Sequence, residues 1–237
     1  MTRLRAVGAA SALLLAVGCS SAPPPAPLEP IRCAVIAAPL LGAPEASDAL
    51  YEVVDVLSAD PDIELVLVVG PLFGAGKQSV ELARDELIGA LGALAGSVHV
   101  ALGPLDLERD PGLLEALERA LPARSAELAY SARVAGVRLD VLGPAGEVPA
   151  DEADAGEGPD RGRELLLGGP PDYPSATLRV THGPALQLEG SSLQVPALGS
   201  GQAVYALLTL NPERGTFSAR LRVGDQDEGE EVRGPWN

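Results

Sequence analysis

The chain has 237 residues, of which 46% are hydrophobic but only 3% aromatic, so it can build one sizeable core made mainly of Leu, Val and Ala. Its formal charge of −16 argues against nucleic acid as a partner and against broad electrostatic attraction to anionic membrane surfaces. The sequence contains two histidines, too few for a histidine-rich metal centre.

Residues 1–18 have the features of an export signal. Two arginines precede an apolar segment, 6–17, which is too short to span a bilayer as a helix. The segment ends in Leu15-Ala16-Val17-Gly18-Cys19, which resembles the lipobox of bacterial lipoproteins, with Ala16 where that motif usually has Leu. The resemblance implies cleavage before Cys19 and lipidation of this residue. The alternative is an ordinary secretory signal with a chance cysteine.

Residues 19–30 are predicted to be a linker. The segment contains five prolines and no apolar periodicity, which favours an extended, polyproline-like spacer. Such a spacer would hold the folded part, predicted to cover residues 31–223, away from the bilayer.

From residue 31 the sequence alternates between short apolar runs and helical patterns. Each run ends in a turn that contains proline, which is typical of buried strands, and the predicted strands are 33–37, 65–69 and 97–102. A helical pattern follows each strand, and the predicted helices are 45–58, 80–94 and a third that Asp110 would cap. Three βα units in succession predict a parallel sheet.

After the third helix the pattern changes to a series of short strands. The predicted strands are 127–134, 137–142, 165–167, 177–181, 186–188, 203–210 and 216–223, with a hairpin at each end of the series. Residues 144–163 are predicted to form an acidic loop, and residues 224–237 an acidic, frayed tail. The whole pattern predicts an α/β fold in which two sheets pack together with helices outside.

Several loops follow predicted strands, and parallel strands place such loops at one edge of a sheet. They are Ala38-Pro39-Leu40, Gly70-Pro71-Leu72, Gly103-Pro104-Leu105-Asp106 and His182-Gly183-Pro184. A two-metal hydrolytic centre needs several carboxylates and imidazoles that converge on the ions. This edge offers one carboxylate, Asp106, and one imidazole, His182. The residues therefore indicate a fold of enzymatic type without an evident catalytic centre.

In their order along the chain, these segments resemble the motifs of the calcineurin-like metallophosphoesterases. That family carries D-x-H, G-D, G-N-H-D/E, a lone His and G-H-x-H, each after a strand. The corresponding segments here are Ala38-Pro39-Leu40, Gly70-Pro71, Gly103-Pro104-Leu105-Asp106, His182 and Gly190-Ser191-Ser192-Leu193. The resemblance spans most of residues 31–223. It implies a four-layer α/β/β/α sandwich, and the family's activity is phosphoric ester hydrolysis with two divalent metals.

Nearly all of the ligands that the family would use are replaced in this chain. The substituted positions are Ala38, Leu40, Pro71, Pro104, Leu105, Ser191 and Leu193. Only Asp106 and His182 match the family's pattern. Because small and apolar side chains cannot coordinate divalent ions, neither a metal nor another cofactor is expected.

Two hypotheses about function follow. The first is a non-catalytic lipoprotein of the cell envelope, anchored in the membrane by lipid, which acts as a binding or scaffolding module for an unidentified envelope protein. If the organism has two membranes, the outer one is the expected location. The second is a metal-dependent phosphoesterase with a site rebuilt from Asp106 and His182. Under the first hypothesis Leu40 and Leu105 should be buried where metals would have been, and His182 should be a hydrogen-bonded structural residue.

Overall fold

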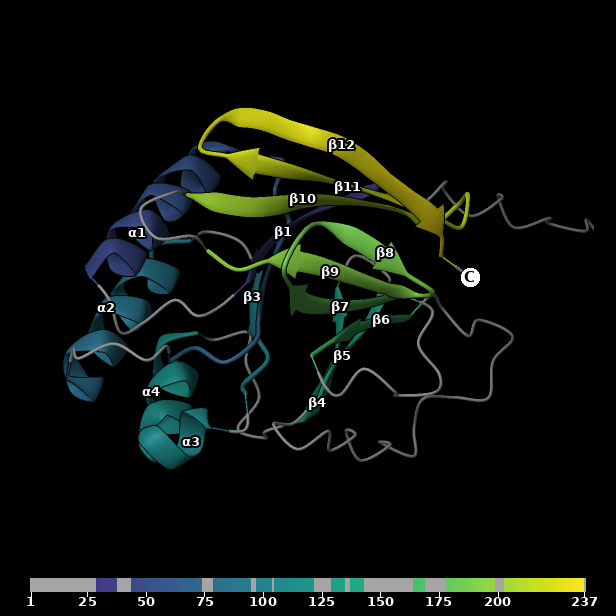
Figure 1. The fold of residues 1–237 in the computed structure, drawn as a ribbon. Helices are drawn as coiled ribbons and strands as arrows, with labels where there is room; N and C mark the ends of the chain where they lie inside the picture. Colours follow the sequence, from purple (N-terminus) through teal and green to yellow (C-terminus); the bar gives the residue numbers. More distant parts are fainter. Residues whose placement is uncertain are drawn as a thin grey trace, which may run out of the picture.

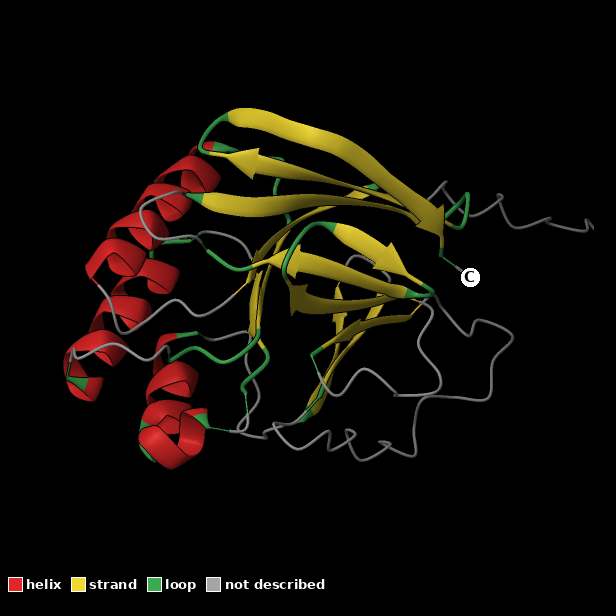
Figure 2. Cartoon of the chain, viewed as in Figure 1, coloured by secondary structure: helices red, strands yellow, loops and turns green. Residues whose placement is uncertain are grey.

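The computed structural model describes residues 29–37, 44–73, 79–94, 97–103, 105–121, 129–134, 137–142, 164–168, 178–198 and 203–236. Its helices and strands form a mixed α/β structure with two sheets, as the sequence predicts (Figures 1 and 2). The helices are α1 (Pro44–Ala59), α2 (Val80–Gly92), α3 (Asp106–Arg109) and α4 (Leu113–Ala120).

The first sheet has six strands in the order β12-β11-β10-β1-β2-β3. Their bounds are β1 (Ile31–Ala37), β2 (Leu65–Val69), β3 (Ser97–Val100), β10 (Val204–Asn211), β11 (Thr216–Val223) and β12 (Gln226–Pro235). The first three strands are parallel to one another, as the βα pattern predicts. An antiparallel ribbon of β10, β11 and β12 extends this sheet from β1.

The second sheet also has six strands, in the order β4-β5-β6-β7-β9-β8. Their bounds are β4 (Tyr130–Val134), β5 (Val137–Val141), β6 (Glu164–Leu167), β7 (Leu178–Gly183), β8 (Gln187–Glu189) and β9 (Ser192–Pro196). The four central strands are parallel, and β4 and β8 pair antiparallel at the two ends of the order.

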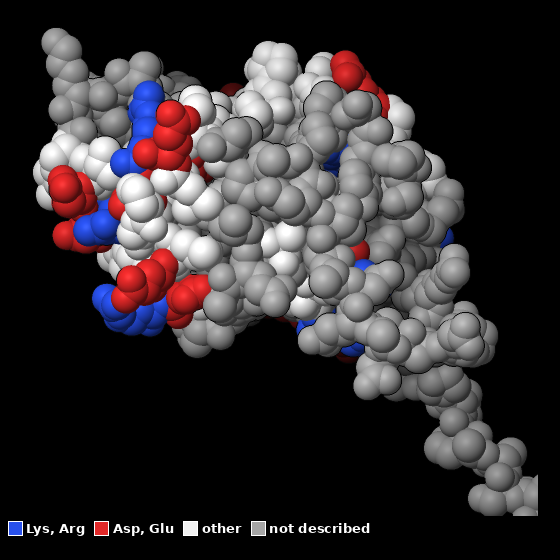
Figure 3. Space-filling view, turned by 90° about the horizontal axis from the view of Figure 1, so that it is seen from below, with Lys and Arg blue, Asp and Glu red and all other residues white. Residues whose placement is uncertain are grey.

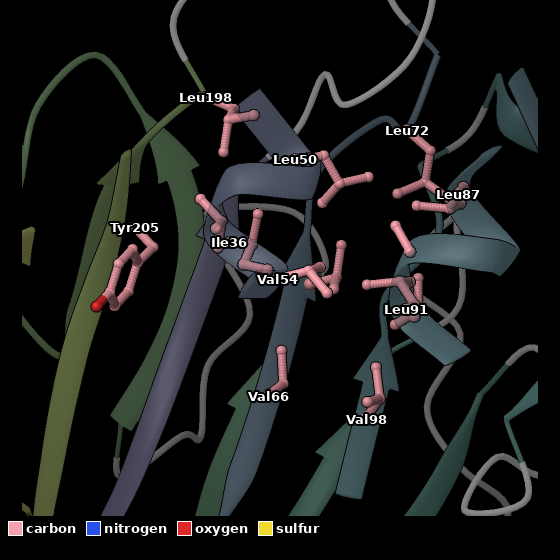
Figure 4. Close-up of a cluster of buried hydrophobic side chains, with 14 of the residues drawn as sticks. Ile36, Leu50, Val54, Val66, Leu72, Leu87, Leu91, Val98, Leu198 and Tyr205 are labelled. Carbon is pink, nitrogen blue, oxygen red and sulfur yellow. The ribbon is translucent and has the colours of Figure 1, made fainter. Parts of the chain in front are cut away.

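The uninterrupted apolar run Leu65–Val69 is explained by burial on both faces of β2. Val66 and Val68 point to the helices, in a helix-side core that includes Leu50, Leu87 and Leu91 (Figure 4). Alternate residues of the same strand point the other way. With side chains from the second sheet they form an inter-sheet core, whose members include Val35, Leu67, Val69, Leu139, Val180, Leu193 and Trp236.

The layers are therefore helices, first sheet and second sheet. The four helices lie together at the left of Figures 1 and 2, on the face of the first sheet turned away from the second. Acidic and basic side chains are interspersed on this side (Figure 3). Over the described part of the chain, no helix covers the outer face of the second sheet. Nor is any helix among these residues long and apolar enough to cross a membrane.

The expected third helix corresponds to α4, and a one-turn helix that was not predicted, α3, precedes it. Asp110 does not cap it, because α4 begins at Leu113, and the N-cap of that helix is Gly112. The Asp110 carboxylate instead accepts a hydrogen bond from the Gly112 amide at 3.1 Å and pairs with Arg84 at 3.1 Å. Asp110 thus forms the turn before the helix and ties it to α2.

The expected frayed tail is wrong. Residues 226–235 form β12, and Trp236 is fully buried in the inter-sheet core, where its amide donates to the Gly215 carbonyl at 2.7 Å. Many charges in this segment suggested a solvated tail, but an edge strand tolerates charged residues because one side faces water. The folded part therefore extends to Trp236. The segment 144–163, expected to be an acidic loop, lies outside the described residues.

Candidate functional site at the strand-end edge

Strands from both sheets end at one place, which we call the strand-end edge. Its described residues are Ala37, Gly70–Phe73, Ala101–Gly103, Leu105, Asp106, Gly168, His182 and Pro196–Leu198. The ends of β1 and β9 meet there, since Ala37 bridges Ala197 in parallel and the Leu198 amide donates to the Ala37 carbonyl at 2.9 Å. The structure thus brings together the loops after β2 and β3 with the end of β7.

Asp106 is the buried acidic group of this edge. Its side chain is fully buried, and Oδ1 accepts hydrogen bonds from the amides of Leu72 at 2.9 Å and Phe73 at 3.2 Å. Oδ2 accepts from the Gly103 amide at 2.6 Å. The carboxylate therefore fastens the loop after β2 to the loop after β3, and three of its roughly four acceptor positions are directed at the backbone.

The electrostatics of Asp106 reflect opposing effects. Burial raises the pKa of its carboxyl group, because a charge in the interior is poorly solvated. The three amide donors and the charge of Arg109 act in the opposite direction and lower the pKa. The rise due to burial is the larger effect.

Two glycines allow these loops to approach so closely. Gly70 has a φ of +94°, in the left-handed region that side chains rarely adopt. A Cβ built on Gly103 would lie 2.8 Å from the Pro71 Cα, so any larger residue would force the two backbones apart. Pro71, which stands at one of the substituted positions, therefore lies in a close backbone contact.

Leu72, after β2, and Leu105, after β3, differ in burial. Leu72 is fully buried and points into the helix-side core (Figure 4), whereas Leu105 is 54% exposed. The expectation that Leu105 is buried is therefore wrong. Leu105 immediately precedes α3, and successive residues at a helix start point about 100° apart, so Asp106 turning inward leaves Leu105 facing out. Leu40, for which the same expectation was made, lies outside the described residues.

His182 is exposed near the end of β7, and its ring lies over Gly70. A Cβ built on Gly70 would be 3.1 Å from the His182 Cγ. Within the part of the chain that the structure describes, the ring makes no hydrogen bond, so the expected role as a hydrogen-bonded structural residue is not observed. Val180, two residues earlier, faces the inter-sheet core, and His182 is on the same face but beyond the rim of that core.

Ser191 and Leu193 are not at the strand-end edge. Leu193 pairs with Val180 near the start of β9 and is fully buried, whereas His182 pairs with Val195 further along the same strand. The assignment of these two residues to the family's last motif is therefore not supported by their position. Strand β9 was not predicted from the sequence, although the glycine turn at Gly190 followed by alternating apolar residues is a usable signal.

Three further residues of the edge were not predicted from the sequence. Gly168 follows β6 with a φ of +82°, and a Cβ built on it would lie 2.8 Å from the Ala101 Cβ. Ala197 and Leu198 follow β9 at the same edge. None of these residues carries a reactive group, which is why no motif pointed to them.

The described residues contain no cluster of three or more His, Cys, Asp or Glu side chains that could hold a metal ion. Ala38, Leu40 and Pro104 lie outside the described residues, as does Cys19. Cys33 is fully buried in β1, and burial raises the pKa of its thiol, which keeps it unreactive. The geometry of the edge favours a rigid structural role for Asp106.

Comparison of the sequence with protein-family models and with curated proteins returned no match. The likeness to the metallophosphoesterases therefore rests on the residue patterns themselves, and the family stays a hypothesis.

Proposed function

We propose that the protein is a non-catalytic lipoprotein of the cell envelope, which uses a metallophosphoesterase-like fold as a binding or scaffolding module for an envelope protein. The observation that carries the proposal is the position of the Asp106 carboxylate, which is buried and hydrogen-bonded to three backbone amides. A metal ligand must offer its lone pairs to the ion. Here three of the roughly four acceptor positions of the carboxylate are already used to connect two loops.

The proposed fold is the four-layer α/β/β/α sandwich of that family. The proposal is supported by the mixed α/β structure, in which two sheets pack together. The carboxyl ends of their parallel strands lie at one edge. The helices of the described residues account for one of the two outer layers. A structure of residues 143–177 would test whether a helical layer covers the second sheet.

Metal content of the full-length protein, purified from membranes in detergent, tests the non-catalytic proposal. We expect no stoichiometric Mn, Fe or Zn by elemental analysis, and no hydrolysis of a generic phosphodiester when these metals are added. Two metals per chain, with hydrolysis that is lost in Asp106→Asn and His182→Ala, would instead support a phosphoesterase with a rebuilt site. That alternative requires Asp106 to give up its three amide donors.

The lipid anchor is tested separately. The proposal requires that the mature chain begin at lipidated Cys19 and fractionate with the envelope, and that Cys19→Ser be processed poorly or not at all. Normal cleavage of this variant, with release of soluble protein, would support an ordinary secretory signal. Mass spectrometry of the mature N-terminus distinguishes the two outcomes.

A further inference from the structure

A hollow of about 530 Å³ lies at the end of the sandwich opposite the strand-end edge, where β1 begins. It is lined by Pro30 and by residues of β10, β11, β12 and the β10–β11 turn. The side chains that the following argument uses are Thr209, Asn211, Arg214, Thr216, Ser218 and Arg233. In Figure 1 this is the end of the ribbon near the label C.

The hollow exists because the helical cover stops there. Helix α1 ends at Ala59, and Asp60, just beyond it, pairs with Arg32 at 3.2 Å. Tyr205, further along the same face of β10, is buried under the helices, whereas Thr209 pairs with Arg32 in register and is only partly buried. Beyond the helix end, the face of the sheet therefore changes from apolar to polar.

The polar residues form two rows across the ribbon. Thr209, Ser218 and Arg233 are register partners on β10, β11 and β12. Asn211 and Thr216 are partners in the next row toward the turn. Since residues two apart on a strand share a face, both rows face the hollow.

The charges of the hollow favour an anion. Its lining contains two guanidinium groups, Arg214 and Arg233, and one carboxylate, Glu231. Glu231 is already shared, since it binds Arg233 through two nitrogens and Arg220 at 3.3 Å. These partners, Arg233 above all, lower the pKa of Glu231 to about 2, so it stays ionised and neutralised.

Arg214 is the available cation. Among the described residues its exposed side chain has no ion-pair partner, while its backbone amide donates to Asn211 Oδ1 at 2.9 Å and so fixes the turn that carries it. The preceding Glu213 is exposed but does not line the hollow. A local excess of positive charge is unusual in a chain whose formal charge is −16.

We propose that this hollow binds a phosphate group carried by a hydroxyl-rich molecule. The guanidinium group of Arg214 donates to the phosphate oxygens, for which its planar fork is well suited. Arg233, which is already paired with Glu231, borders the site and adds to its positive charge. The hydroxyl groups of Thr209 and Thr216 and the side-chain amide of Asn211 bind the remaining oxygens and the neighbouring hydroxyls, whereas the Ser218 hydroxyl is already bonded to Glu231.

Two sources could supply this chemistry, namely the glycerophosphate headgroup of a membrane lipid and a soluble sugar or polyol phosphate. Pro30 lines the hollow and is the last residue of the predicted linker, which in extended form would reach about 35 Å. If the lipid anchor of the proposed function is present, the linker keeps the hollow within that distance of the bilayer, and a headgroup can enter the hollow when the linker is bent toward the membrane. The hollow itself does not depend on that anchor.

The test is calorimetric titration of the full-length protein in detergent micelles with glycerol 3-phosphate, and with glycerol as the uncharged control. We expect binding of the phosphate compound only, weakened about tenfold by Arg214→Ala because one charge-assisted bond to phosphate is lost. The matched control is Arg119→Ala, which removes the same charge from an exposed position on α4. Thr209→Val, which keeps the charge, should also weaken binding but leave the thermal midpoint unchanged.

Absence of glycerol 3-phosphate binding, or equal weakening by Arg214→Ala and Arg119→Ala, would overturn the proposal. Micelles doped with phosphatidylglycerol then identify the source. Competition with glycerol 3-phosphate indicates a lipid headgroup, and no competition indicates a soluble phosphate compound. Because the titration does not depend on how the N-terminus is processed, its failure is distinguishable from failure of the lipid-anchor proposal.

Discussion

The two ends of the sandwich differ in what their charged groups do. At the strand-end edge, Asp106 is buried and its oxygens are bound by backbone amides, and the loops around it are in close backbone contact. At the opposite end, Arg214 is exposed and lines an open hollow without an ion-pair partner among the described residues.

The difference teaches that a polar residue at a strand end is not by itself evidence of a binding site. A group whose hydrogen-bonding capacity is used inside the protein contributes to stability, whereas a group with unused capacity at a hollow can contribute to binding. By this criterion Asp106 has a structural role, and Arg214 is a better candidate than Asp106 for binding a ligand. Substitutions at the strand-end edge should therefore change stability, in proportion to burial.

The largest expected effect is a difference in stability between substitutions at two leucines of the edge, Leu72 and Leu105. Leu72→Asp places a charge in the helix-side core, and we expect it to cost more than about 4 kcal/mol of unfolding free energy, whereas Leu105→Asp, at an exposed position, should change it by less than about 0.5 kcal/mol. Urea unfolding followed by the fluorescence of the single tryptophan, Trp236, measures both. Comparable losses in the two variants would mean that Leu105 is buried after all.

Removal of the Asp106 side chain should have the next largest effect. Asp106→Ala leaves three buried amides without an acceptor, which should cost about 3 kcal/mol or more. Asp106→Asn should cost less, because its carboxamide oxygen can still serve Leu72 and Phe73 while only Gly103 loses its acceptor. Glu115→Ala, at an exposed ion pair on α4, is the control and should have almost no effect. An unchanged urea midpoint for Asp106→Ala would contradict the structural role of Asp106.

Substitution of two glycines should separate backbone strain from close packing. Gly190 and Gly70 both have positive φ angles, but only Gly70 lies against a side chain, that of His182. We expect Gly190→Ala to cost about 1 kcal/mol, and Gly70→Ala to cost more because its Cβ meets the imidazole ring. In the double variant Gly70→Ala/His182→Ala, the additional cost of Gly70→Ala over Gly190→Ala should disappear. If the double variant shows no such recovery by thermal unfolding, His182 does not pack there in solution.

The smallest effect should be a pH dependence. Because burial raises the pKa of Asp106, the folded protein holds this proton up to a higher pH than the unfolded chain does. Its contribution to stability is therefore present at low pH and lost as the pH rises through the folded-state pKa. The unfolding free energy of the native protein, relative to Asp106→Asn, should increase as the pH falls from about 7 to about 4. A trend of the opposite sign would mean that the amide donors dominate.

The sequence by itself determined the βα units of the first sheet. An apolar run such as Leu65–Val69 and the helical pattern of α2 are local signals, and each specifies its element almost without regard to the rest of the chain. The same locality placed Asp106 next to the end of β3, since a residue that follows a strand must lie near its end.

The tertiary structure alone decided what each residue faces. The direction of Leu105 and Asp106 depends on how α3 begins, and the burial of Leu193 depends on the register of β9 beside β7. Strand β12 depends on its partner strand β11, and the burial of Trp236 depends on a core built from distant segments. A sequence pattern cannot supply these facts, because they arise from contacts between residues far apart in the chain, whereas the periodicity that marks a helix or a strand is a property of neighbouring residues.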